Sequence, residues 1–127
     1  MTARRILLVE DDRFLRRACE VSLRQRGYAV TTAVDGEEAL RKVAAETPDL
    51  ILLDLLMPKM TGTEVLKALR ADQATREIRV LILSNSSREQ DIEEINALGV
   101  SGYFVKADLS LQALGEMVAR LLEADHG

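Results

Sequence analysis

The sequence feature that most constrains the fold is an unbroken aliphatic run, Leu50 to Leu53, that ends in the carboxylate of Asp54. A run without polar alternation is typical of a strand buried on both faces, as in a parallel sheet covered by helices. Pro58 follows shortly and cannot continue a strand ladder, so the chain must leave the sheet there. Open α/β sheets bind ligands at the carboxyl ends of their strands, and Asp54 is predicted to lie at such an end.

Four further segments have the composition of strands, at residues 6–9, 28–34, 78–83 and 102–105. Helical patterns of about ten to fifteen residues separate the five strands, and the order of elements predicts βαβ units with right-handed crossovers. We therefore expect an α/β fold with a doubly wound, five-stranded parallel sheet and five helices. At 127 residues, the chain is expected to be one domain, residues 1–127, without an output domain.

Capping residues and glycines indicate where the helices begin and end. Asp35, Thr61 and Ser87 each have Glu or Gln three residues later, which is the spacing of a capping box. Gly27 and Gly99 are expected to end the first and fourth helices in the left-handed conformation. The first helix is predicted to bury an inward stripe made of Phe14, Leu15, Ala18, Cys19 and Leu23.

The composition of the chain limits the kinds of partner and the cellular compartment that fit it. The net charge of −4 argues against nucleic acid as the main partner, because the chain has no excess of cations to neutralise phosphates. The single cysteine, Cys19, excludes an internal disulfide and favours the cytoplasm, and it is expected to be a small buried residue. No apolar run reaches the 20 or so residues of a membrane span. The single histidine, His126, lies near the C-terminus and is interpreted as part of the tail.

Polar residues that carry chemistry stand at the ends of the predicted strands. Glu10 and Asp11 follow the first strand, Asp54 ends the third, Ser84 the fourth, and Lys106 follows the fifth. In a doubly wound sheet these ends share one edge, so three carboxylates would converge and repel one another unless a cation joins them. Oxygen ligands of this kind suit Mg²⁺, and Lys106 and Ser84 offer donors to phosphate oxygens. The set predicts a site where a phosphoryl group is carried by the Asp54 carboxylate.

The chain resembles the receiver domain of two-component response regulators, the CheY-like fold, over essentially its whole length. The matching pieces are Val9 to Asp12, Asp54 to Pro58, Leu83-Ser84 and Gly99 through Lys106. The resemblance implies the strand order 2-1-3-4-5.

The resemblance also implies roles for individual residues. Asp54 would accept the phosphoryl group, and Lys106 would bind it. Mg²⁺ would be held by the side chains of Glu10, Asp11 and Asp54 and by the main-chain carbonyl of Leu56. The donor would be a phosphohistidine on a sensor histidine kinase or a phosphotransfer protein.

For signalling, the resemblance implies a switch made of Ser84 and Tyr103. The phosphorylated aspartate would draw in the Ser84 hydroxyl, and Tyr103 would turn inward. This change would remodel the face formed by the fourth helix, fifth strand and fifth helix, where a downstream protein or a second copy binds. The chain is thus expected to be a monomer or a phosphorylation-dependent dimer, cytoplasmic, with no nucleic-acid or membrane partner.

Three positions near the site require separate interpretation. Ala107 stands where the family usually has a proline, and a trans bond from Lys106 is expected because a cis bond before a non-proline residue costs about 2.5–4 kcal/mol. Asn85 stands where the family usually has a small residue, which affects access to the site. Asp12 lies just beyond the acidic pair and is interpreted as a helix N-cap.

Other functions were weighed against this one. A Mg²⁺-dependent phosphohydrolase with an Asp nucleophile would need an Asp-x-Asp motif after the first strand, and Glu10 breaks that motif. A flavodoxin-type FMN carrier would need a Ser/Thr-rich phosphate loop, where this chain has three acids. A phosphorylation-independent adaptor on the same fold remains the alternative that the site residues disfavour without excluding.

Overall fold

The computed structural model describes residues 3–57, 59–84, 89–108 and 110–123. Within them, five strands alternate with five α-helices, and a short 3₁₀ helix, Lys106–Asp108, follows the last strand. The strands are β1 Arg5–Val9, β2 Ala29–Ala33, β3 Leu50–Asp54, β4 Arg79–Ser84 and β5 Gly102–Val105. The α-helices are α1 Arg13–Gln25, α2 Gly36–Ala45, α3 Gly62–Ala71, α4 Glu89–Ala97 and α5 Leu111–Glu123.

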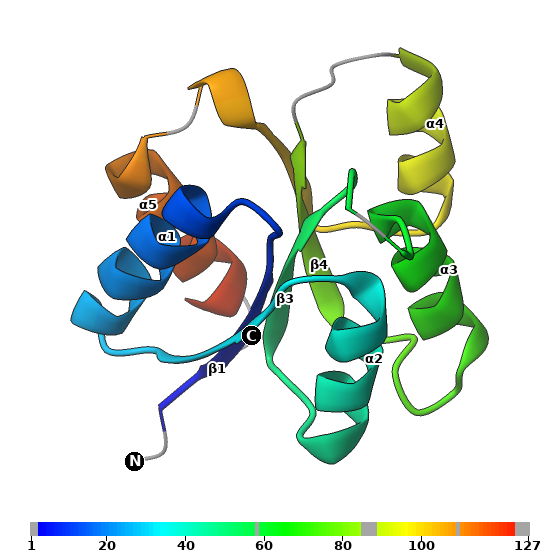
Figure 1. The fold of residues 1–127 in the computed structure, drawn as a ribbon, viewed down its shortest axis with the longest axis horizontal. Helices are drawn as coiled ribbons and strands as arrows, with labels where there is room; N and C mark the ends of the chain where they lie inside the picture. The colour runs from blue at the N-terminus through cyan, green and yellow to red at the C-terminus, as the bar shows by residue number, and fades with distance from the viewer. Residues whose placement is uncertain (1–2, 58, 85–88, 109, 124–127) are drawn as a thin grey trace.

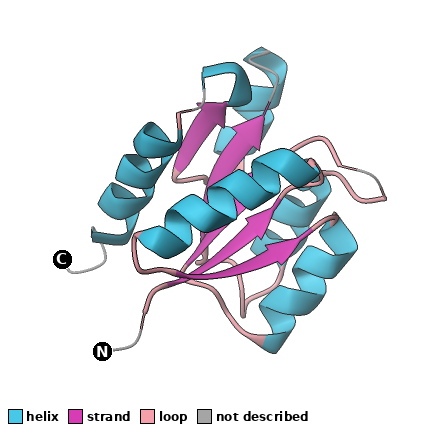
Figure 2. Cartoon of the chain, turned by 60° about the vertical axis from the view of Figure 1, so that its left-hand side comes forward, coloured by secondary structure: helices cyan, strands magenta, loops and turns pink. Residues whose placement is uncertain are grey.

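All strand pairs are parallel, and the order across the sheet is β2-β1-β3-β4-β5. The predicted doubly wound sheet and its strand order are therefore confirmed. Helices α1 and α5 lie on one side of the sheet and α2, α3 and α4 on the other (Figure 1). A view turned by 60° shows the twist of the sheet between these two helical layers (Figure 2).

Alternate residues along the strands point to opposite faces of the sheet and pack into two separate hydrophobic cores. In β1, Leu7 and Val9 pack toward α2 and α3, whereas Ile6 and Leu8 pack toward α1 and α5. All five residues of β3 are buried, which explains why that segment reads as a continuous aliphatic run rather than an alternating one. The burial fixes the register of the sheet, because a slip of one residue would exchange the two faces.

The predicted helix ends are confirmed where the structure describes them. Asp12 Oδ1 accepts from the backbone N–H groups of Phe14 at 2.9 Å and Leu15 at 3.0 Å, so this aspartate is the N-cap of α1. Asp35 and Thr61 cap α2 and α3 through the N–H groups three residues later. Gly27 and Gly99 have φ of 97° and 78°, the left-handed region expected of glycine after a helix. The cap predicted at Ser87 lies outside the described residues, as do Pro58, Asn85 and His126.

One part of the inward stripe predicted for α1 is wrong. Cys19 and Leu23 are buried and Leu15 is partly buried, but Phe14 is 84% exposed. At about 100° per residue, Phe14 lies roughly 140° around the helix from Cys19, whereas Leu15 and Leu23 lie within about 40° of it. The prediction included Phe14 in the stripe because the residue is apolar, and did not consider its angular position on the helix.

Arg70 of α3 forms hydrogen bonds with the main chain at the C-terminal end of helix α4. The Arg70 guanidinium donates to the carbonyls of Leu98 at 2.8 Å and Gly99 at 2.7 Å, and also to that of Arg76 at 2.9 Å. The Leu98 carbonyl is one that the helix end leaves without an intrahelical partner, whereas Gly99 and Arg76 lie in the loops that follow α4 and α3. Among the described residues, no helix combines the length and the apolar character that crossing a membrane requires.

Candidate functional site

The register of the sheet brings the predicted site residues to one edge. Val9 pairs with Leu53, so Glu10 emerges beside Asp54 at the carboxyl ends of β1 and β3. Ser84 pairs with Val105, so Lys106 emerges immediately beyond the end of β4. The β1–β3 boundary is also where the strand order reverses, which is the position at which doubly wound sheets form their crevice.

At this edge, a lysine lies between two buried carboxylates. Lys106 Nζ is 2.6 Å from Glu10 Oε1 and 3.1 Å from Asp54 Oδ1. The Glu10 side chain has no exposed surface, that of Asp54 is 2% exposed and that of Lys106 is 12% exposed. Further donors hold the acids in place, because the Asp12 N–H binds Glu10 Oε2 at 2.9 Å and the Leu56 N–H approaches Asp54 Oδ1 at 3.3 Å.

Burial and like charge shift the protonation of the site. Desolvation, together with the negative charge of Glu10, raises the pKa of Asp54 to about 7, and the Lys106 ammonium only partly opposes this shift. Burial alone would lower the pKa of Lys106, but the adjoining Glu10 and Asp54 carboxylates outweigh it and raise that pKa. The lysine therefore stays charged, while Asp54 holds a proton more readily than an exposed aspartate.

The arrangement fits a cation. Carboxylate oxygens of Glu10, Asp11 and Asp54 all lie within 4.8 Å of one another. Asp54 Oδ2 is buried and has no hydrogen-bond partner among the described residues. A buried acceptor without a partner is costly, and a hard cation with oxygen ligands would satisfy it. The exposed Asp11 leaves one side of the cluster accessible from solvent.

The remaining predicted residues are positioned by the strands that carry or precede them. Ser84 is buried at the end of β4, and Tyr103 is partly buried against the core on the α2, α3 and α4 side of the sheet. Leu56, whose main-chain carbonyl was predicted as a ligand, lies two residues after the end of β3, and its side chain is 63% exposed. The described residues contain no cis peptide bond, so the bond from Lys106 to Ala107 is trans, as expected.

Sequence reasoning missed two residues that shape the site. Arg16 of α1 donates to the backbone carbonyls of Glu10 and Asp11, and its position one turn after the Asp12 cap is the signal that could have indicated it. Gly62 begins α3 against the end of β3, where a Cβ atom would lie 2.7 Å from the Cα of Leu55 and would also collide with the carbonyl of Asp54. Only the three-dimensional approach of α3 to β3 reveals this second constraint.

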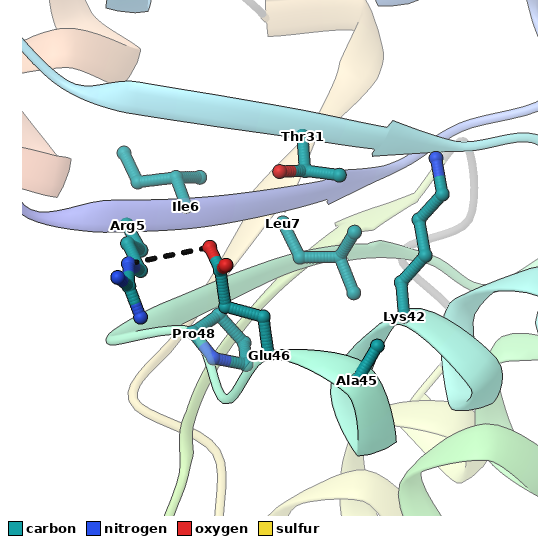
Figure 3. A pocket seen from close by; sticks show the side chains of 8 residues that line it. All are labelled: Arg5, Ile6, Leu7, Thr31, Lys42, Ala45, Glu46 and Pro48. Carbon is teal, nitrogen blue, oxygen red and sulfur yellow. Dashed lines mark ion pairs between the residues drawn. The ribbon is translucent and has the colours of Figure 1, made fainter.

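A hollow of about 180 Å³ lies at the opposite end of the sheet, between β1, β2 and the end of α2 (Figure 3). Its charged residues are already engaged, because Arg5 Nε lies 3.3 Å from Glu46 Oε1 and Lys42 donates to the Thr32 carbonyl. This hollow has no carboxylate cluster comparable to the one at the carboxyl edge. The carboxyl edge is therefore the candidate functional site.

Comparison with known proteins identifies the class of this fold and site. Residues 6–119 match the model of the response regulator receiver domain, and the chain belongs to that family. It is 39% identical over 121 residues to the transcriptional regulatory protein PrrA of Mycobacterium tuberculosis, covering 95% of this chain and 49% of the relative. The chain spans about half or less of the length of the first curated relatives it matches.

Solved structures agree with this assignment. The chemotaxis protein CheY4 of Vibrio cholerae superposes with a TM-score of 0.88 at 32% identity, covering 94% of this chain and 99% of that one. The phosphorylated cyanobacterial phytochrome response regulator RcpA superposes with a TM-score of 0.81 at 34% identity, covering 96% and 93%. The chain is thus a response regulator receiver domain of two-component signalling, and its fold is that of a signalling domain.

Proposed function

We propose that this receiver, taken as one unit over residues 1–127, accepts a phosphoryl group on Asp54 and signals through protein contacts. The single observation that carries the proposal is the environment of Asp54. Its Oδ2 is buried without a hydrogen-bond partner among the described residues, while Lys106 lies 3.1 Å from its Oδ1. An unsatisfied carboxylate oxygen beside a fixed ammonium suits a nucleophile for phosphorus.

Mg²⁺ would be held by the side chains of Glu10, Asp11 and Asp54 and by the main-chain carbonyl of Leu56. When bound, it would lower the pKa of Asp54 and neutralise charge on the phosphoryl oxygens. The proximity of the three carboxylates, within 4.8 Å of one another, supports this assignment. Mg²⁺ commonly takes only one or two carboxylates and keeps waters, and the exposed Asp11 leaves room for them.

The transfer itself needs little from the protein beyond orientation and charge. An Asp54 oxygen forms the new O–P bond as the P–N bond of a phosphohistidine breaks, and the leaving imidazole takes the electron pair. Lys106, held by Glu10 at 2.6 Å, neutralises the transferred group. Ser84, buried at the end of the neighbouring strand, then donates its hydroxyl to a phosphoryl oxygen.

The output follows from the position of these residues. Ser84 and Tyr103 are the proposed switch, and the face of α4, β5 and α5 is the proposed binding surface for a downstream protein or a second copy. Tyr103 supports this assignment because it is only partly buried and packs against the core beneath α4. The donor would be a sensor histidine kinase or a phosphotransfer protein. We place the exchange in the cytoplasm, in keeping with the single buried thiol of Cys19.

The proposal is tested by intact mass spectrometry after incubation with Mg²⁺ and phosphoramidate, a donor that needs no kinase. We expect one added phosphoryl group on the wild type, none on Asp54→Asn, and none on the wild type when EDTA is present. Lys67→Met serves as a control, because it removes an exposed lysine of α3 that pairs with Glu94. If the wild type forms no adduct with phosphoramidate and Mg²⁺, the phosphoacceptor role is contradicted and a phosphorylation-independent adaptor is favoured.

A further inference from the structure

The guanidinium of Arg16 connects α1 to the acidic loop that precedes it. Its Nη1 donates to the backbone carbonyl of Glu10 at 2.9 Å and to that of Asp11 at 3.3 Å. Arg16 is half-buried, in contrast to the exposed Arg17 beside it. One guanidinium therefore contacts the main chain of the first two of the three acidic residues that follow β1.

The two carbonyls belong to the peptide units on either side of Asp11. Each peptide unit is planar, so the orientation of a carbonyl fixes the orientation of its whole unit. Holding both units restricts φ and ψ of Asp11, and these angles set the direction in which its side chain leaves the backbone. Arg16 is thereby able to orient a carboxylate that it does not itself contact.

Asp11 depends on this contact more than its neighbours in the cluster. Glu10 is held by its N–H bond to the Ala33 carbonyl at 3.0 Å and by Lys106, and Asp54 is the last residue of a central strand. Asp11 is exposed and lies in the loop between β1 and α1. Its carboxylate oxygen nevertheless lies within 4.8 Å of oxygens from the two buried acids.

The start of α1 determines where the guanidinium can reach. Asp12 caps the helix with its side chain, and its carbonyl accepts from the Arg16 N–H at 2.9 Å, the first intrahelical bond. Side chains on a helix lean toward its N-terminus, so Arg16 is directed back over the loop. Cap and guanidinium together close a compact unit of residues 10–16.

We propose that Arg16 is a positioning residue for the cation site, acting through the backbone of Glu10 and Asp11 to orient the Asp11 carboxylate. This inference rests on the proposed function, because it concerns the same metal site. The sign of the charge makes it testable. Removing a positive charge near a cation site would by itself strengthen Mg²⁺ binding, so weaker binding in a folded neutral variant is opposite to the effect of charge and indicates lost positioning.

The test is a Mg²⁺ titration of the unphosphorylated protein, followed by amide NMR shifts, with no phosphoryl donor present. We expect Arg16→Met to bind Mg²⁺ about tenfold more weakly than the wild type, the usual effect of removing a partner that orients a metal ligand. Arg16→Lys should show a smaller loss, because a single ammonium cannot reproduce the fork of the guanidinium. Arg17→Met is the matched control: it removes the same charge from the next residue, which pairs with Glu20 at 3.2 Å, and it should not weaken binding.

Each outcome has a definite meaning. Unchanged Mg²⁺ affinity in Arg16→Met would overturn the inference while leaving the proposed function intact. A wild type without Mg²⁺-dependent shifts would instead contradict the proposed metal site. If Arg16→Met does not fold, Arg16→Lys decides, and wild-type affinity in that variant would overturn the role of the two-carbonyl contact.

Discussion

Lys106 Nζ lies 2.6 Å from Glu10 Oε1, inside a cluster where the Glu10 side chain has no exposed surface. The lysine is also 3.1 Å from Asp54 Oδ1, so a single ammonium stands between two buried carboxylates. Ion pairs of this kind are often not better than a well-packed apolar core, but breaking one leaves an uncompensated charge. Removing one charged partner from this cluster should therefore destabilise the folded protein.

Replacing Lys106 by methionine should destabilise the metal-free protein strongly at pH 8. Loss of one partner from a buried pair typically costs about 3–5 kcal/mol, because the remaining carboxylates are left without a counter-charge. Urea unfolding measures the change in the free energy of unfolding. Lys67→Met removes an exposed pair of similar length, 2.9 Å to Glu94, and should cost less than about 1 kcal/mol. Equal effects of the two substitutions would show that burial gives the Lys106 pair no special weight.

The stability of the metal-free protein should fall as pH rises toward neutrality. The pKa of Asp54 is raised to about 7 by burial and by Glu10, so the folded state holds a proton that the unfolded state releases near its ordinary value of 3.8. The stability from that proton is fully present below about pH 4 and is lost as pH rises through about 7, with a limiting slope near 1.4 kcal/mol per pH unit.

Urea unfolding in EDTA at pH 5 and pH 8 measures this dependence. Asp54→Asn should remove it, and saturating Mg²⁺ should weaken it in the wild type. Asp35→Asn is the control, because the Glu38 N–H and Lys59 lower the pKa of Asp35 below its ordinary value of 3.8. Its contribution is lost only as pH falls below that value, so this variant should keep the wild-type difference between pH 5 and pH 8. A wild-type slope that persists in Asp54→Asn would assign the effect to another group.

The sequence predicted the convergence of the site because it depends on topology rather than on side-chain detail. Once the aliphatic runs are interpreted as parallel strands, Glu10, Asp54, Ser84 and Lys106 must share one edge. The strand order came from the resemblance to receivers and was confirmed by the sheet.

What the sequence did not indicate depends on angles and close approaches. The direction of Phe14 on α1 needed the phase of the helix, and Phe14 proved to be 84% exposed. The contact of Arg16 with two carbonyls needed a side-chain conformation, and the tight fit at Gly62 needed the distance between α3 and β3. Propensities and patterns contain none of these quantities.

Gly62→Ala should impair both stability and the site. An added Cβ would lie 2.7 Å from the Cα of Leu55 and would also meet the Asp54 carbonyl, so the end of β3 or the start of α3 must move. Overpacking of this kind costs about 1–3 kcal/mol. Because the displaced segment carries Asp54, Mg²⁺ affinity should fall as well, as measured by amide NMR titration.

Gly27→Ala is the matched control for this prediction. Gly27 has φ of 97° and open space around its Cβ position, so alanine there adds backbone strain of about 1 kcal/mol without a collision. Gly27 lies at the end of α1, remote from the carboxyl edge, and its substitution should leave Mg²⁺ affinity unchanged. A Gly62→Ala variant with wild-type Mg²⁺ affinity would show that the loop absorbs the added methyl group without moving Asp54.

Strand β2 forms one edge of the sheet, and two cations cover its outward carbonyls. The Ala29 N–H donates to the Arg4 carbonyl, and the Ala33 carbonyl accepts from the Glu10 N–H, so both groups face β1. Backbone groups alternate in direction along a strand, so the intervening Val30 and Thr32 carbonyls point away from the sheet. Each accepts from a side chain of a flanking helix, Val30 from Arg24 of α1 at 3.0 Å and Thr32 from Lys42 of α2. An acid one turn earlier pairs with each cation, Glu20 with Arg24 at 2.9 Å and Glu38 with Lys42 at 3.6 Å.

The double variant Arg24→Met with Lys42→Met should therefore self-associate more than the wild type. It uncovers two acceptors on an edge strand, and a second chain could pair with them by adding a strand. Sedimentation velocity over a range of concentrations measures the association. Arg17→Met with Arg41→Met removes the same charge from exposed positions of α1 and α2, so it controls for net charge. Equal association of the two double variants would show that charge, and not cover of the β2 edge, governs it.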